Sequence, residues 1–292
     1  MNYLLILLSI SMETCKNIFL NSFSKDGPKN DADIYKFNTS LYIGSALILL
    51  PMIGTFRVSS FSLLMAVVFA AVTSLCQIFY LKALKHGSMA YSTFLMGSGL
   101  IIPTICGILF WGETPKLTQY IAFPMLLLAM GLVLAPKKGE EEKFKITGKW
   151  LFSAMMTLVF TGLIGVIQAV HQESEFKGEI MPFLVYTFIF TTLGNYIVYL
   201  ITNKTQEKST YKIKSRVTVF AVISGLFMGV VNWLNLYLAG CGLSKIIVFP
   251  ALNGGLIFMS LLAAVIFFKE KPSPRQWVGM IAGITALCLL GL

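Results

Sequence analysis

Charged side chains are scarce in this chain of 292 residues, and their scarcity limits the class of protein it can form. They make up 12% of the sequence, whereas apolar residues make up 56%. A soluble domain carries about 25% charged residues, so these side chains cannot cover a water-exposed surface. Apolar runs of about 20 residues, each long enough to cross a bilayer core, predict an all-α polytopic membrane protein with ten transmembrane helices. The expected spans are residues 3–22, 38–56, 61–81, 89–111, 118–136, 149–170, 181–202, 216–238, 246–268 and 275–292.

Residues that metal, disulfide or phosphate chemistry would require are few or scattered. The two histidines, His86 and His171, have no companion ligands in sequence, and the five cysteines show no CxxC spacing. This pattern argues against a metal site and against disulfides. No phosphate-binding loop, nucleophile motif or paired acidic cluster is present, which argues against ATP-driven work and against catalysis. We therefore expect no cofactor, no metal and no catalytic residues.

The net charge of +10 is distributed unevenly between the expected loops. Loops after the odd-numbered spans, counted with the first residue of the span that follows, hold 18 lysines and arginines, whereas loops after the even-numbered spans, counted in the same way, hold four. Because basic residues are retained in cytoplasmic loops, this bias places the odd loops inside and both termini outside. The charge therefore indicates topology in a lipid bilayer and gives no reason to expect a nucleic-acid partner.

An internal repeat relates two parts of the chain. Tyr80–Ala135 and Tyr237–Leu292 align without a gap, and ten of 56 columns are identical, including Glu113 with Glu270. Each copy holds three spans, and the copies are five spans apart, so the second enters the membrane from the opposite side. The chain is therefore expected to form two five-helix inverted-topology repeats, 1–136 and 149–292, joined by a polar linker at 137–148. Such repeats are typical of secondary transporters, and their presence in one chain predicts a monomer.

These features resemble a known family. The five-plus-five plan, the short loops with Glu-x-Pro after the fourth and ninth spans, and the glutamine downstream of each are similar to the EamA-type branch of the drug/metabolite transporter superfamily. The resemblance implies a multi-pass protein of the cell membrane that moves small solutes, and it leaves the substrate open. It also implies cytoplasmic termini, the reverse of the charge count.

The first span carries a polar stripe. Ser9, Glu13 and Asn17 lie four residues apart and share one helical face, and an ionisable residue in mid-span is a functional candidate by default. The position of Glu13 also resembles the first-helix glutamate of small multidrug resistance proteins, where a carboxylate exchanges protons for cations. Alternatively, Lys16 pairs with Glu13 as a neutral structural element, which would suit a zwitterionic substrate better than a cationic drug.

The eighth span supplies a second group of candidates. Asn232 and Asn235 are three residues apart and nearly share a face, and Trp233 could form an aromatic wall. Two carboxamides and an aromatic ring suit a polar or zwitterionic small molecule. The alternative is hydrogen bonding between helices, worth about 0.6–2 kcal/mol.

The repeat suggests further contacts. Tyr80, three residues after Gln77, occupies the same repeat column as Tyr237, so inverted symmetry would place the two tyrosines on opposite sides of a central cavity. Asn253 begins an Asn-Gly-Gly segment that matches Gly97-Ser98-Gly99 in the other copy. These small residues predict close helix packing or a partly unwound segment at a binding site.

The matched pair Glu113 and Glu270 could be taken as proton-coupling carboxylates. Each lies near a helix end and is followed by proline two residues later, so we expect them to complement helix N-termini instead.

The sequence favours a secondary active transporter that moves a small polar or zwitterionic metabolite by alternating access, driven by protons or another coupling ion. One alternative is a proton-coupled exporter of lipophilic cations or drugs. Another, of a different class, is a lipid-handling or enzymatic polytopic membrane protein.

Overall fold

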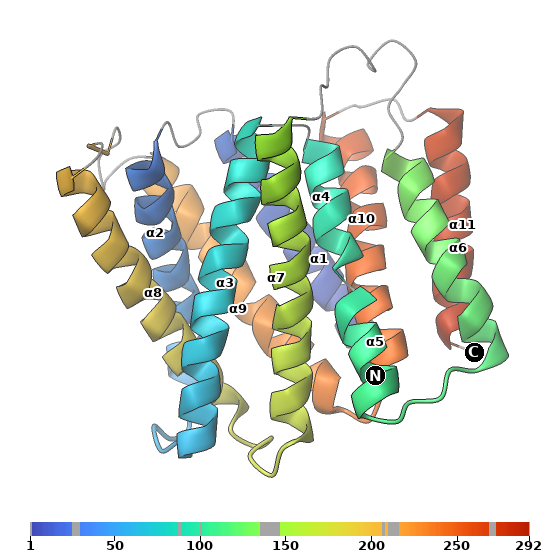
Figure 1. The fold of residues 1–292 in the computed structure, drawn as a ribbon, viewed down its shortest axis with the longest axis horizontal. Coiled ribbons are helices and arrows are strands. Elements are labelled where there is room, and N and C mark those ends of the chain that lie inside the picture. Colours follow the sequence, from blue (N-terminus) through green and yellow to red (C-terminus); the bar gives the residue numbers. More distant parts are fainter. Residues whose placement is uncertain are drawn as a thin grey trace.

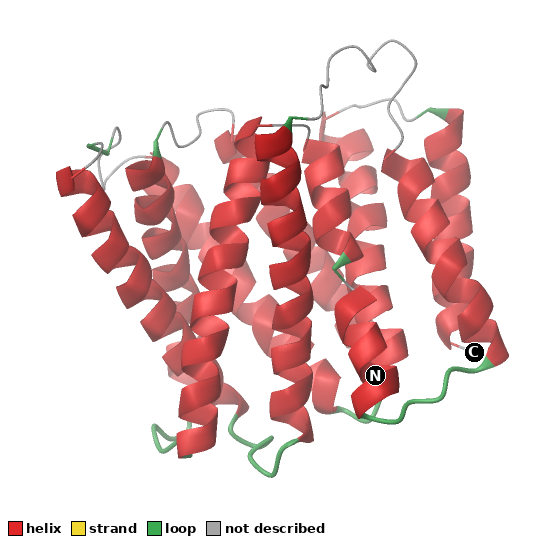
Figure 2. Cartoon of the chain, viewed as in Figure 1, coloured by secondary structure: helices red, strands yellow, loops and turns green. Residues whose placement is uncertain are grey.

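The computed structural model describes residues 2–24, 30–86, 89–99, 101–134, 147–205, 208–209, 216–268 and 273–291, and regular structure within these ranges is entirely helical (Figure 2). The helices are α1 (Asn2–Ser24), α2 (Asp31–Leu49), α3 (Ser60–His86), α4 (Met89–Ser98), α5 (Ile101–Phe110), α6 (Leu117–Leu134), α7 (Gly148–Glu173), α8 (Ile180–Thr205), α9 (Arg216–Gly240), α10 (Lys245–Phe268) and α11 (Pro274–Gly291). A short 3-10 helix, Leu50–Met52, follows α2.

Within the part of the chain that the structure describes, five helices, α1, α3, α7, α8 and α9, are long and apolar enough to cross a membrane. Large apolar side chains also face outward, among them Leu4, Leu128 and Ile266, each about 70% exposed (71%, 70% and 68%). The remaining helices run alongside these five, and both chain termini lie at the same end of the bundle (Figure 1). The chain is an integral membrane protein, because such a surface is matched to lipid and not to water.

The second expected span, 38–56, is wrong by about two turns, because α2 occupies Asp31–Leu49. Asn30 caps this helix by accepting a hydrogen bond from the Asp33 backbone N–H, and two aspartates in the first turn favour the helix N-terminus. A span predicted from hydropathy leaves out this polar first turn of α2, although the turn is helical.

The fourth expected span is interrupted at Gly99, where α4 gives way to α5 (Figure 2). Pro103 lies four residues later, has no backbone N–H for the Gly99 carbonyl, and would press its ring against that carbonyl in a continuous helix. Ile102 donates to the Gly99 carbonyl instead, at 3.1 Å. The matched segment at Asn253 lies inside the unbroken helix α10, so the unwound segment considered from sequence occurs in one copy only.

The helices can be divided into two groups, each with helices from both halves of the sequence, and the groups also contact each other through α1 with α10 and through α7 with α4 and α5. We call α1, α2, α3, α7, α8 and α9 the large body, whose core includes Phe37, Phe69 and Phe188. The small body comprises α4, α5, α6, α10 and α11, with Leu126 and Phe258 in its core. The expected repeats, 1–136 and 149–292, are therefore interleaved in space, and most of the linker at 137–148 lies outside the described residues.

Glycines allow α2 and α9 to approach closely within the large body. A Cβ atom at Gly225 would lie 1.8 Å from the Leu41 carbonyl oxygen, and one at Gly44 would lie 2.3 Å from the Val222 carbonyl oxygen. Ser45 donates to the Gly225 carbonyl across the same contact, at 2.9 Å. Small residues at such crossings are the usual means of packing membrane helices.

Two glutamates in short loops cap helices that are distant in sequence. Glu113 accepts hydrogen bonds from the backbone N–H groups of Lys245 and Ile246 at 2.9 and 3.1 Å, so it caps α10. The expectation that Glu113 complements a helix N-terminus is thus met, although Glu270 lies outside the described residues. Glu179 caps α3 through the Ser59 N–H. Burial raises the pKa of Glu179, but hydrogen bonds from serines outweigh burial and leave the pKa below its usual value.

Candidate functional site

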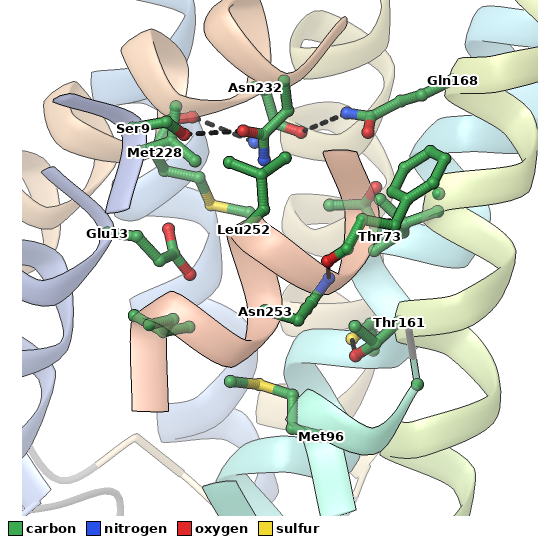
Figure 3. Close-up of a pocket in the computed structure, with 18 of the residues that line it drawn as sticks. Ser9, Glu13, Thr73, Met96, Thr161, Gln168, Met228, Asn232, Leu252 and Asn253 are labelled. Atoms are coloured by element: carbon green, nitrogen blue, oxygen red, sulfur yellow. Dashed lines mark hydrogen bonds between the residues drawn. The ribbon is translucent and has the colours of Figure 1, made fainter. Parts of the chain in front are cut away.

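A cavity of about 140 Å³ lies between the two bodies (Figure 3). Helices α1, α3, α7 and α9 of the large body form most of its wall, and α4, Gly99, α5 and α10 of the small body complete it. The helix break at Gly99 therefore lies at the cavity itself.

The polar stripe of α1 faces this cavity. Ser9, Glu13, Lys16 and Asn17 all line it. Lys16 Nζ donates to Glu13 Oε1 at 2.5 Å, and the two side chains are only 10% and 18% exposed. The charges therefore neutralise each other inside the cavity wall, as the structural alternative for this pair predicts.

The carboxamides of α9 also face the cavity, and each is held by another helix (Figure 3). Ser9 of α1 donates to Asn235 Oδ1 at 2.6 Å, and Gln168 of α7 donates to Asn232 Oδ1 at 3.5 Å. Both amides thus take part in the interhelical hydrogen bonding that was the alternative to solute binding. Trp233 does not line the cavity; it packs against the core of the large body.

Three buried side chains in the cavity wall retain polar atoms without a hydrogen-bond partner. They are both amide atoms of Asn17, the Nε2 of Gln77 and the hydroxyl of Thr73. Their residues are 5%, 6% and 2% exposed, respectively. An unsatisfied buried polar atom costs about 1–3 kcal/mol, and a polar group that entered the cavity could satisfy these atoms.

Tyr80 and Asn253 complete the set of expected residues that the structure brings together. Eight of the nine expected residues line the cavity: Glu13, Lys16, Asn17, Gln77, Tyr80, Asn232, Asn235 and Asn253. Asn253 donates to the Phe249 carbonyl of its own helix at 3.0 Å. Tyr237 is 37% exposed and lies outside the cavity, so it does not face Tyr80. It follows Asn235 by two residues, about 200° around the helix.

The sequence reasoning missed several lining residues. Thr73, Gln77 and Tyr80 lie at i, i+4 and i+7 of α3, a spacing that could have identified Thr73. Thr161 of α7 lies 3.3 Å from Cys76 in the same wall, and neither residue is distinctive in sequence. Among the described residues, no group of three metal-binding side chains occurs.

Apolar helices around a buried polar cavity define an integral membrane protein that can hold a small solute within the bilayer, the architecture of a transporter. Comparison with known proteins specifies the family. The chain belongs to the sugar transport protein family, whose family model matches residues 36–291. It is therefore a membrane transporter, and its EamA-type relationship stays a prediction.

Two curated relatives align with part of the chain. An uncharacterized protein of Haemophilus influenzae is 22% identical over 217 residues, which cover 72% of this chain and 68% of the relative. The "Probable glucose uptake protein GlcU" of Priestia megaterium is 24% identical over 198 residues, covering 67% of this chain and 65% of that protein. The chain thus matches about two thirds of the length of each.

A solved crystal structure shares the fold over nearly the whole chain. It superimposes with a TM-score of 0.76 at 11% identity and covers 99% of this chain and 95% of its own. At this identity the likeness concerns the fold alone.

Proposed function

We propose that this protein is a secondary transporter for a small uncharged polar solute of the monosaccharide class, bound in the cavity between the two bodies. The observation that carries the proposal is the α1–α3 wall, where Asn17, Gln77 and Thr73 are buried with unpaired polar atoms. A sugar hydroxyl both donates and accepts hydrogen bonds, so a polyol can satisfy amide donors, amide acceptors and a hydroxyl together.

The electrostatics of the cavity support a solute without net charge. The ionised groups in its lining, Glu13 and Lys16, are paired with each other. A lipophilic cation would compete with Lys16 for the carboxylate, which argues against the drug-export alternative. The glucose uptake activity in the name of the Priestia megaterium relative agrees with a neutral sugar.

Helix packing supports two structurally related halves. If the first five segments correspond in order to the last five, α1 matches α7, α2 matches α8, and α3 matches α9. The α1–α9 contact then has its counterpart in α3–α7, and the α2–α9 contact in α3–α8. We therefore propose ten membrane crossings in an EamA-type arrangement, working as a monomer in the cell membrane with protons or another ion as the coupling partner.

A zwitterionic solute is the second candidate. Glu13 and Lys16 present a carboxylate and an ammonium group side by side in the cavity wall. An amino acid could engage both groups without changing the net charge of the site.

The proposal is tested by ligand-dependent thermal stabilisation of the purified full-length protein. We would add D-glucose, other monosaccharides, zwitterionic amino acids and choline to wild type, to Asn17→Leu and to Asn38→Leu. Asn38 is the matched control because both its amide atoms are also buried and unpaired, yet it lies in α2 outside the cavity. A ligand at 100 times its Kd stabilises the folded state by about 2.7 kcal/mol.

A monosaccharide should raise the melting midpoint of wild type and of Asn38→Leu but not of Asn17→Leu. Stabilisation by amino acids alone would instead support the zwitterion. Stabilisation by sugar that survives Asn17→Leu unchanged would contradict the role given to the α1–α3 wall. Uptake of radiolabelled glucose into proteoliposomes then distinguishes transport from binding.

A further inference from the structure

Two small apolar clusters join the large and small bodies, one at each end of the cavity. The terminal seam, near the chain termini, consists of Ile6, Ile10, Leu238, Val248 and Leu252. The distal seam, at the opposite end, consists of Ala83, Leu95, Trp150 and Ala154. Both are separate from the cores within the two bodies. Separation of the bodies at one end would therefore disrupt one seam and leave both cores intact.

The terminal seam borders the cavity directly and is reinforced by an ion pair. Ile10 and Leu252 belong both to the seam and to the cavity lining. Lys245, in the first turn of α10, forms an ion pair with Glu173 at the end of α7. Because α10 belongs to the small body and α7 to the large body, this ion pair crosses the junction. Glu113 of the small body, 3.6 Å from Lys245, stays with α10 as its cap.

On the side that faces away from the inner cavity, this ion pair borders another pocket. A second cavity of about 500 Å³ is lined by Glu113, Gln172, Glu173 and Lys245, among others. Gln172 lies one helical turn beyond Gln168, which lines the inner cavity. The ion pair and the terminal seam thus stand between an outer vestibule and the proposed solute site.

The distal seam has a polar link of a different kind. The indole Nε1 of Trp150, in α7, donates to Ser92 Oγ, in α4, at 2.9 Å, and the contact is buried. Since α4 belongs to the small body, this hydrogen bond also crosses between the bodies. Leu95 of the seam precedes Met96 of the cavity lining.

We infer that the two seams are the two gates of the transport cycle, with Lys245–Glu173 holding the terminal gate and Trp150–Ser92 holding the distal gate. The inference rests on the proposed alternating-access function. It adds which groups of helices separate and which contacts hold them together at each end. The bodies that separate are not the two halves of the sequence, because each body combines helices from both. α7 contributes to both links, so it is the element against which the small body tilts.

The test measures access to the cavity from each side without any solute. The full-length protein, with its five native cysteines replaced by alanine, receives a reporter thiol at the cavity wall through Thr161→Cys. It is reconstituted into liposomes and exposed to a membrane-impermeant maleimide from either side. A parallel Thr55→Cys version, in the exposed loop after α2 at the same end as the termini, reports orientation.

Glu173→Gln should raise the labelling rate from the terminal side about threefold or more and leave the distal side unchanged or slower, because one charged contact is lost. Trp150→Phe should produce the reverse. Two matched controls remove contacts inside the large body. Asp31→Asn breaks the ion pair with Lys82, and Tyr42→Phe removes the buried hydrogen bond to the Thr73 carbonyl. Neither control should shift access toward one side.

Opposite, side-specific changes in the two gate variants, absent from the controls, support the inference. The inference is overturned if both gate variants increase labelling from the same side. It is also overturned if neither gate variant differs from its control, provided that the melting midpoints show that the variants and controls are folded. Because labelling needs no solute, the result is independent of whether a sugar stabilises the protein. A failure of the sugar proposal and a failure of the gates are therefore distinguishable.

Discussion

At the scale of single residues, the charges of Glu13 and Lys16 are energetically costly, because both lie within an apolar helix. Their pairing one turn apart makes the wall neutral where a solute would bind. Breaking a buried pair by removing one partner costs about 3–5 kcal/mol, whereas replacing both partners together is often nearly neutral.

This asymmetry gives a prediction. Lys16→Met should lower the free energy of unfolding by about 2–3 kcal/mol, somewhat less than for a fully buried pair, because it leaves the Glu13 carboxylate uncompensated. The double variant Glu13→Leu/Lys16→Met should recover most of the loss. Melting midpoints of the purified protein in one detergent would measure both. A double variant as unstable as the single one would show that Glu13 has another essential partner.

Helical spacing was enough to predict much of the site at this scale. Ser9, Glu13 and Asn17 share a face at any reasonable position of α1, so the spacing alone brought them together. Trp233 and Tyr237 were misplaced although the same spacing could have excluded them, because they lie about 100° from Asn232 and about 200° from Asn235, respectively, around α9. Which amides would be unpaired, Asn17 but not Asn235, could not be inferred without the partner helices.

At the scale of elements, close contact between α2 and α9 determines the shape of the large body. Gly225 and Gly44 bring the two backbones together, and backbone atoms at such a contact cannot move aside as a flexible side chain can. The sequence shows these glycines but not which helices they join. Helix boundaries were predicted well, except where polar residues begin α2 and where Pro103 interrupts a run that hydropathy predicts as continuous.

Gly225→Ala should therefore destabilise the protein by about 3 kcal/mol, since its Cβ would overlap the Leu41 carbonyl and force the helices apart. Gly194→Ala is the matched control, because Gly194 lies within α8 and a Cβ there would meet nothing within 4 Å. The control should be neutral or stabilised by up to about 1 kcal/mol. Equal midpoints for the two variants would contradict the close α2–α9 contact.

At the scale of the whole molecule, the two sequence halves are interleaved. α1 packs chiefly on α9 and α10, and α3 packs on α7 and α8, so helices of each half find their main partners in the other. The repeat alignment predicted two related halves. It could not predict this exchange of partners, because an alignment of one half with the other contains no information about contacts between them.

Separate expression of the halves should test the interleaving. Fragments 1–136 and 149–292 should each fail to give a monodisperse, cooperatively melting protein, because each lacks the partners of its longest helices. Co-expression should restore a complex that co-purifies through a tag on one fragment. A stable, folded 1–136 fragment would contradict the assignment of α1 to contacts with α9 and α10.

The pairing of Glu13 with Lys16 has a consequence for biosynthesis. Ribosomes complete α1 long before its packing partners α9 and α10 exist, so α1 must enter the bilayer alone. A lone lysine or acidic residue at the centre of an inserting helix costs about 2.5–3.5 kcal/mol. A counter-charge on a later helix would arrive after insertion, whereas one carried a single turn away in α1 is present from the start. The local ion pair thus allows this polar helix to enter the membrane before α9 and α10 have been made.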